Sequence, residues 1–279
     1  MKKYKIICSV IILTGLCLGY KCYKYYREVN VDKTAPIISY DGDLVISVNA
    51  SLEELLSGVK AIDEVDGDVS DTLVIENYSK ISDDNKINVT YAAYDKSNNV
   101  AKVTRIIEYT DYQLPQFKLN KPLIFNSVKL TSLLGAIEAY NVRGENISNR
   151  IRVQYQQDPS EMNKTDINYP INFAVTDELG GTKNITLNVD IVDNKSNYNN
   201  DIEVNLKDYL IYVDKNEKIN LSRYLDSIVY QNEEQRINYR NLEIETDLDT
   251  SVSGVYDVYF NYTLSNNLSG YSKLVVVVN

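Results

Sequence analysis

The chain has 279 residues, of which 44% are hydrophobic, and it carries a formal net charge of -10 with no histidine. The missing histidine excludes His-based catalysis and His-ligated zinc, and the acidic balance argues against nucleic acid, which requires a basic face. The three cysteines, Cys8, Cys17 and Cys22, all lie near the N-terminus, so the rest of the chain is expected to hold neither a disulfide nor a cysteine nucleophile.

Near the N-terminus lies an uncharged, mostly apolar run, residues 6–20, with basic residues on both sides. We interpret residues 1–29 as a cytoplasmic tip, a transmembrane anchor and a stem, which places the following domains outside the cell. The alternative is a cleaved signal peptide followed by secretion, because the run also has the length of a signal-peptide core. The flanks favour the uncleaved anchor, since no small-x-small cleavage site follows Tyr20.

After this segment, a domain-sized pattern of roughly 80 residues occurs three times, which is too long for a solenoid repeat. Each copy has a leucine-led motif early, beginning at Leu56, Leu134 and Leu225. Each also has a later run of alternating apolar and polar residues, at 87–95, 169–177 and 256–264. We therefore predict three domains, which we call the first repeat (30–111), the second repeat (112–193) and the third repeat (200–279).

Strand and turn patterns inside the repeats predict an all-β fold of three antiparallel sandwiches behind the N-terminal helix. Turns are expected at Asp66-Gly67, at Gly180-Gly181 and at Asn266-Asn267, and each repeat closes on a β-rich run at 103–109, 185–192 or 274–278. The sequence of residues 51–54 has the form of a capping box and predicts a short helix. The polar linker 193–201 is predicted to be flexible, and the linker 111–115, which contains a proline, to be stiffer.

The first repeat resembles the bacterial immunoglobulin-like surface repeats, including the hyalin-repeat-like domains. The resemblance lies in residues 32–36 (DKTAP), 61–70 (AIDEVDGDVS) and 91–101 (YAAYDKSNNVA). The second repeat keeps the proline, the aspartate that ends the alternating strand and a Gly-Gly turn, and the third keeps only the strand and helical-turn pattern. The resemblance implies an immunoglobulin-like sandwich and a role at the cell surface, with no shared enzymatic activity.

An acidic cluster in the first repeat is the strongest candidate for a metal site. Carboxylate oxygens around a glycine turn are ligands that Ca²⁺ prefers, and Asp95 or Asp111 would add a ligand if the fold brought it near. The alternative is a solvated β-turn with no ion, because the spacing differs from an EF-hand loop and the other repeats lack the cluster. The predicted ligands are Asp63, Asp66, Asp68 and Asp71.

No enzymatic activity and no cofactor other than this calcium are expected, because the chain has no histidine and no Gly-x-Ser-x-Gly motif. Two function classes remain: a structural stalk or protein-interaction module at the cell surface, and an adhesin or glycan-binding protein. The expected partners are other envelope or host-surface proteins, or glycans, with the membrane bound through the N-terminal helix. The 24 tyrosines discriminate between the classes, since rings on one exposed face favour binding and rings in the cores favour the stalk.

Overall fold

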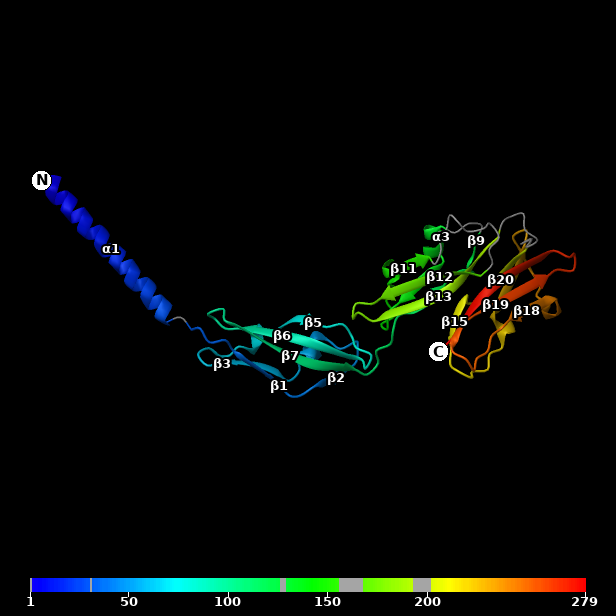
Figure 1. The fold of residues 1–279 in the computed structure, drawn as a ribbon, viewed down its shortest axis with the longest axis horizontal. Helices are drawn as coiled ribbons and strands as arrows, with labels where there is room; N and C mark the ends of the chain where they lie inside the picture. Colours follow the sequence, from blue (N-terminus) through cyan, green and yellow to red (C-terminus); the bar gives the residue numbers. More distant parts are fainter. Residues whose placement is uncertain (1, 31, 126–128, 156–167, 193–201) are drawn as a thin grey trace. The chain divides into compact units, whose positions relative to one another are not determined.

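The computed structural model describes residues 2–30, 32–125, 129–155, 168–192 and 202–279 (Figure 1). Contacts divide the chain into two compact units, Met1–Thr110 and Asp111–Asn279. Beyond the N-terminal helix, both units are built from β-strands and short helical turns (Figure 1), which confirms the all-β prediction. The linker 193–201, predicted to be flexible, lies outside the described residues.

A long helix, α1 (Lys2–Asn30), begins the first unit. Its uncharged run is shorter than the roughly 20 residues that span a bilayer, and Lys5 and Lys21 bound that run. Among the described residues, no helix is both long enough and apolar enough to cross a membrane. The helix α1 occupies the segment that the sequence analysis interpreted as a transmembrane anchor and stem.

The first repeat consists of two sheets in the first unit. A capping box at Ser51 begins α2, as predicted: the Ser51 hydroxyl accepts from the Glu54 N–H, and the Glu54 carboxylate accepts from the Ser51 N–H. One sheet has the order β1 (Ile37–Tyr40), β3 (Val59–Asp63) and β4 (Gly67–Asp68), and the other has the order β2 (Leu44–Ile46), β7 (Val100–Tyr109), β6 (Lys86–Tyr94) and β5 (Val74–Tyr78), with α2 (Leu52–Leu55) and η1 (Ser70–Thr72) between strands.

Alternation along β6 builds the core of the first repeat. Ile87, Val89 and Tyr91 are buried at every second position, as the period of a strand requires. The Tyr91 hydroxyl donates to the Leu55 carbonyl at 2.6 Å, so the buried ring also satisfies its polar tip. Arg105 is buried too, and its guanidinium donates to main-chain carbonyls.

The second repeat has the same four-stranded sheet as the first, while its smaller sheet has two strands instead of three. Its core gathers residues from both of its sheets, among them Phe117, Ile137 and Phe173. One sheet pairs β8 (Gln116–Leu119) with β10 (Ile137–Tyr140), and the other has the order β9 (Ile124–Phe125), β13 (Thr182–Ile191), β12 (Tyr169–Thr176) and β11 (Arg152–Tyr155), with α3 (Leu130–Leu134) and η2 (Ser148–Arg150) between strands.

The third repeat has this four-stranded sheet again. In every repeat, a short early strand pairs in parallel with the closing strand, and the preceding two strands continue the sheet in antiparallel order. One sheet has the order β14 (Glu203–Leu206), β16 (Leu225–Tyr230) and β17 (Glu233–Gln235), and the other has the order β15 (Leu210–Val213), β20 (Ser269–Val278), β19 (Gly254–Thr263) and β18 (Leu242–Thr246), with η4 (Leu221–Tyr224) and η5 (Tyr239–Asn241) between strands.

Strand β20 is buried on both faces and joins the second and third repeats. Leu274 and Val276 belong to the core of the third repeat, whereas Val275 and Val277 belong to the core of the second. The Tyr212 hydroxyl also accepts from the main-chain N–H of Phe117, at 2.9 Å. The two repeats thus share apolar packing and form one unit.

Candidate metal centre

Four carboxylates converge at one end of the first repeat. One oxygen from each of Asp32, Asp63, Asp66 and Asp95 lies within 4.8 Å of the other three. Asp32 belongs to the segment between α1 and β1, Asp63 ends β3, Asp66 lies in the turn that follows, and Asp95 follows β6. The fold therefore assembles the cluster from three separate parts of the sequence.

The turn after β3 holds Asp63 in place. Its Oδ1 accepts from the main-chain N–H groups of Val65, at 2.9 Å, and Asp66, at 2.8 Å. Gly67 closes the turn with a φ of 76°, a backbone conformation that glycine adopts without strain. Asp63 is only 3% exposed, and within the described residues its Oδ2 has no hydrogen-bond donor.

Asp95 closes the turn between β6 and β7. Its Oδ1 accepts from the Asn99 N–H at 2.7 Å, and its Oδ2 accepts from the Asn99 side-chain amide at 2.6 Å. The same amide donates to the main-chain carbonyl of Asp32 at 3.0 Å. Asn99 therefore ties the segment before β1 to the turn after β6.

Asp32 and Asp66 are half-buried members of the cluster. The Thr34 hydroxyl and N–H both donate to Asp32 Oδ1, and they hold the pKa of Asp32 below its ordinary value. Asp66 accepts from the Lys96 N–H at 2.9 Å and pairs with the Lys96 ammonium at 3.3 Å. The Lys96 side chain is 80% exposed, so it offsets little of the charge of four carboxylates.

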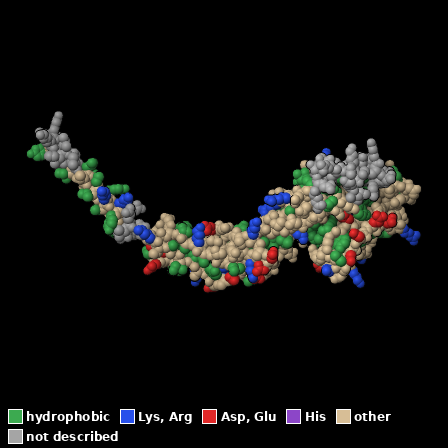
Figure 2. Space-filling model, in the orientation of Figure 1, with side chains coloured by type: hydrophobic (Ala, Val, Ile, Leu, Met, Phe, Trp, Pro, Cys, Tyr) green, Lys and Arg blue, Asp and Glu red, His purple; other side chains and the backbone are tan. Residues whose placement is uncertain are grey.

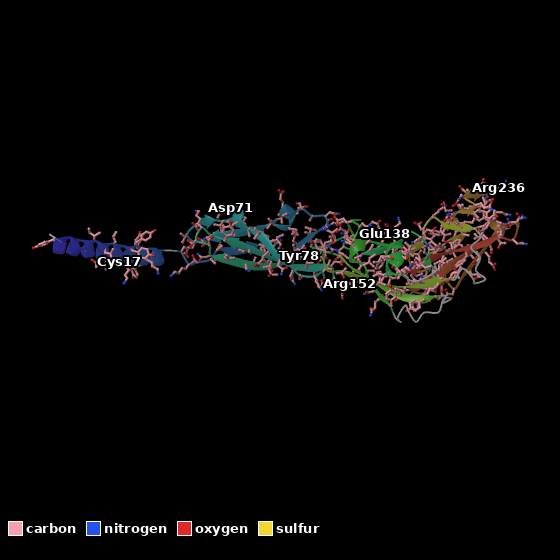
Figure 3. The ribbon with its side chains drawn as sticks, turned by 90° about the horizontal axis from the view of Figure 1, so that it is seen from above. Cys17, Asp71, Tyr78, Glu138, Arg152 and Arg236 are labelled. Atoms are coloured by element: carbon pink, nitrogen blue, oxygen red, sulfur yellow. The ribbon has the colours of Figure 1, made fainter. Side chains whose placement is uncertain are left out.

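The structure brings together two of the four predicted metal ligands. Asp63 and Asp66 converge, and Asp95 joins them as the sequence allowed. Asp68 instead accepts from the Ser70 N–H in its own turn, and Asp71 lies exposed at the surface of the first repeat (Figure 3). Neither of these, nor Asp111, belongs to the converging group. Sequence reasoning missed Asp32, whose only signal was its position in the DKTAP motif.

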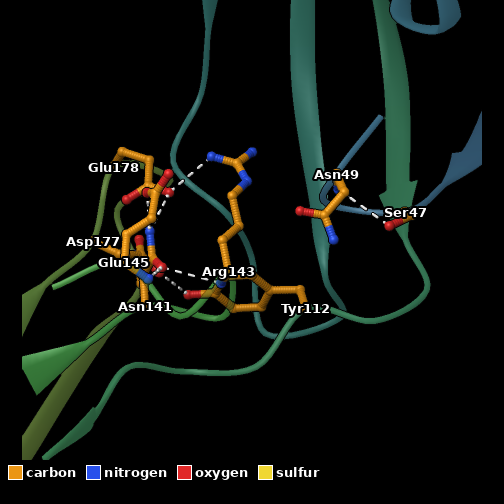
Figure 4. A network of polar contacts seen from close by, with 9 residues as sticks. Ser47, Asn49, Tyr112, Asn141, Arg143, Glu145, Asp177 and Glu178 are labelled. Atoms are coloured by element: carbon orange, nitrogen blue, oxygen red, sulfur yellow. Dashed lines mark hydrogen bonds and ion pairs between the residues drawn. The ribbon is translucent and has the colours of Figure 1, made fainter. Parts of the chain in front are cut away.

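The second repeat has the corresponding turn with a different side chain at its start. In both repeats, an alanine N–H donates to a serine hydroxyl nine residues later at 3.0 Å, which aligns Asn141 with Asp63. Asn141 Oδ1 accepts from the N–H groups of Arg143 and Glu145, and its amide donates to the carboxylates of Glu145 and Glu178 (Figure 4). Arg143 pairs with Glu178 at 3.1 Å.

The turn after β12 likewise corresponds to the turn at Asp95. Asp177 Oδ1 accepts from the Gly181 N–H at 2.9 Å, and its Oδ2 accepts from the Tyr112 hydroxyl at 2.7 Å (Figure 4). Burial, with the nearby carboxylates, raises the pKa of Tyr112. A Cβ at Gly181 would lie 1.6 Å from the Tyr112 hydroxyl oxygen, so glycine makes room for the tyrosine. In the second repeat, donors of the chain itself therefore satisfy these groups.

A second group of buried charges lies where the second and third repeats meet. The Lys273 ammonium is fully buried and lies 3.0 Å from Asp190 Oδ2 and 3.9 Å from Asp257 Oδ2. It also donates to the Asn188 carbonyl at 2.9 Å. Burial raises the pKa of Asp257 although Lys273 lowers it, because burial penalises the charged form of a carboxyl.

A cleft of about 360 Å³ opens beside this group of charges. Carboxylates, amides, one tyrosine ring and one valine form its walls. The lining residues are Asn168, Asn188, Glu245, Thr246, Asp247, Val255, Asp257 and Tyr259.

No family model matches the chain, and no curated protein matches it. Its structure is similar to that of ZmpB from Clostridium perfringens, an M60 catalytic domain with two CBM51 domains, at 11% identity and a TM-score of 0.23 over 87% of this chain and 30% of that one. It is also similar to the protocadherin GammaB4 extracellular domain, at 12% identity and a TM-score of 0.20 over 88% of this chain and 49% of that one. Mouse cadherin-23 EC22–24 matches at 13% identity and a TM-score of 0.20, over 88% of this chain and 99% of that one. The chain thus spans less than half of the first two proteins.

Proposed function

We propose that this chain is a non-catalytic array of three immunoglobulin-like sandwiches that acts as a structural stalk or protein-interaction module on the outside of the cell. The observation that carries the proposal is the order of the four-stranded sheet, which occurs three times with the same parallel and antiparallel pairings. Repetition of one small sandwich gives an array of similar surfaces. The proposal rests on the β-repeats and needs no membrane-spanning helix.

The exposure of the tyrosines and the distribution of surface charge support a structural role. The chain has no histidine. Among the described residues of the repeats, tyrosine rings are mostly buried or half-buried, and Tyr78, Tyr94 and Tyr239 are the strongly exposed ones. Those three do not gather in one repeat. On the face shown in Figure 2, acidic and basic side chains are interspersed, as on a solvated surface.

Accessibility on living cells tests the location. In a variant whose three native cysteines are replaced by serine, Asp71→Cys would place one thiol on an exposed turn of the first repeat. We expect a membrane-impermeant maleimide to label this variant on intact cells as fully as in lysates. A control with the buried Ala61→Cys should stay unlabelled in both. Labelling of Asp71→Cys in lysates alone would refute an extracytoplasmic array.

Glycan binding is the second candidate, and the cleft between the second and third repeats is the observation that favours it. Its wall combines carboxylates and amides with the ring of Tyr259, and sugars bind to such a combination of hydrogen-bonding groups and an aromatic ring. A glycan array probed with the full chain tests this candidate. Binding that Asp247→Ala abolishes and Asp71→Ala preserves would support it over the stalk.

A further inference from the structure

We infer that Asp32, Asp63, Asp66 and Asp95 form a Ca²⁺ site, and that the bound ion fastens the segment before β1 to the first repeat. This inference goes beyond the proposed array, which does not require a metal. It rests on an orphaned buried oxygen, on the spread of the four ligands, on their charge and on the contrast with the second repeat.

The orphaned oxygen belongs to Asp63. Asp63 is only 3% exposed. Its Oδ1 already accepts two main-chain N–H groups, and its Oδ2 has no donor among the described residues. Asp32 is similar: its Oδ1 accepts hydrogen bonds from Thr34, whereas its Oδ2 is buried without a donor among the described residues. A buried charged oxygen without a partner is costly, and a cation would satisfy both oxygens at once.

The spread of the ligands suits calcium. Ca²⁺ binds six to eight oxygens at about 2.3–2.6 Å, so two oxygens on opposite sides of the ion lie up to about 5 Å apart. The four carboxylate oxygens lie within 4.8 Å of one another, so one ion can reach all of them. Mg²⁺ needs shorter and more regular coordination, at about 2.0–2.1 Å, and ligand oxygens up to 4.8 Å apart fit it less well.

The charge of the cluster points the same way. Four carboxylates face one another, and the cation paired with them in the described structure is the exposed Lys96. The second repeat builds the same turn with the neutral Asn141, the Arg143–Glu178 ion pair and the Tyr112 hydroxyl. The second repeat therefore shows that the fold does not require four converging carboxylates at this end, and among the described residues such a group occurs in the first repeat.

The position of Asp32 gives the ion a structural consequence. Three ligands come from turns anchored by β-strands, whereas Asp32 lies in the segment that connects α1 to β1. Without the ion, repulsion among the carboxylates is relieved most easily by moving that segment. Calcium should therefore hold residues 32–36 against the repeat, including the exposed Lys33.

Calcium titration of the full chain after EGTA treatment tests the site. We expect a dissociation constant of roughly 10⁻⁴ to 10⁻³ M, as in extracellular calcium modules. At a tenfold excess of CaCl₂ over the dissociation constant, the melting temperature of the first unit should rise by roughly 5–10 °C. Lys-C cleavage after Lys33 should slow by up to about tenfold, because the factor 1 + [L]/Kd sets the maximum protection. MgCl₂ at the same concentration should produce less than half of either effect.

Asp63→Asn is the decisive variant. It keeps the Oδ1 acceptor, as Asn141 does in the second repeat, and it removes the charge, so it should fold and lose the calcium response. Asp66→Asn provides a second variant in a half-buried position, and the exposed Asp71→Asn is the matched control that should respond like the wild type. The calcium site would be overturned if the wild type showed no calcium effect or responded equally to magnesium. It would also be overturned if Asp63→Asn kept the full response, or if Asp71→Asn lost it equally. The labelling of Asp71→Cys on intact cells tests the location of the array, so its outcome does not depend on the calcium results.

Discussion

The acidic turn of the first repeat and the matching turn of the second solve one structural problem with different chemistry. Both turns place a side-chain oxygen under two main-chain N–H groups, Asp63 in one and Asn141 in the other. In the second repeat, Arg143 and Tyr112 complete the polar contacts. In the first, the corresponding space holds more carboxylates. The turn therefore requires a particular backbone conformation but not a particular charge on its side chains.

The largest loss of stability is expected from replacing Lys273, whose buried ammonium pairs with Asp190 inside the second unit. Lys273→Met would leave Asp190, which is 1% exposed, without its ion-pair partner. Breaking one partner out of a buried pair costs about 3–5 kcal/mol, and urea unfolding followed by circular dichroism measures this loss in the second unit. The triple variant Lys273→Met/Asp190→Asn/Asp257→Asn should recover at least half of it. An equal loss in the triple variant would show that packing, rather than charge, is responsible.

A smaller loss is expected from Tyr112→Phe, which removes the donor to Asp177 Oδ2. A lost hydrogen bond to a buried charged group costs about 1.5–3 kcal/mol. Thermal unfolding of the second unit measures it, with Tyr140→Phe as the control because that hydroxyl donates to a half-buried Glu138. If both variants unfold at the same temperature, the Tyr112–Asp177 contact contributes no more than a surface hydrogen bond.

Asn141→Asp gives the second repeat the carboxylate that the first repeat has at the corresponding position, Asp63. The new carboxylate would face Glu145 and Glu178 and lose two donated hydrogen bonds, although Arg143 would offset part of the repulsion. We expect a loss of about 1 kcal/mol, and calcium should not restore it because Tyr112 already occupies Asp177. Unfolding curves with CaCl₂ and with EGTA measure both effects. A calcium response in this variant would mean that one carboxylate suffices to make the turn a metal site.

The smallest effect concerns pH. Burial raises the pKa of Asp257 above its ordinary value of 3.8, so the folded state retains a proton that the unfolded chain releases. The resulting stability is fully present below 3.8 and is lost as pH rises through the raised pKa. Asp257→Asn cannot titrate, so its stability should fall less than that of the wild type between about pH 4 and pH 7. Parallel pH profiles for the two proteins would contradict a raised pKa.

The sequence predicted the local features of the fold because each depends on neighbouring residues. The alternating runs became β6, β12 and β19, the Ser51 capping box begins α2, and the Asp66-Gly67 turn has its left-handed glycine. The apolar run 6–20 lies within α1, which continues through the basic residues on both sides of the run. Propensity and periodicity identify a helix, whereas a membrane span depends on length and on charge together.

The candidate site was predicted only in part because it depends on long-range assembly. Asp63 and Asp66 share one turn, and their proximity follows from the sequence. Asp32 joins them through contacts to Asn99, which lies 67 residues away along the chain, and no local pattern encodes that pairing. Asp68 and Asp71 were counted because they are near in sequence, yet the turn directs Asp68 to Ser70 and leaves Asp71 exposed.

Because β20 is buried on both faces, it constrains the order in which the second unit can fold. The contact between Lys273 and Asn188 spans 85 residues, and that between Phe117 and Tyr212 spans 95. Pairings over such separations form slowly, so the apolar face of the second repeat stays uncovered until β20 arrives. During that interval it is a surface on which nascent chains can stick to one another. The residues that complete the second repeat are thus encoded in the third, which makes the pair inseparable in biogenesis.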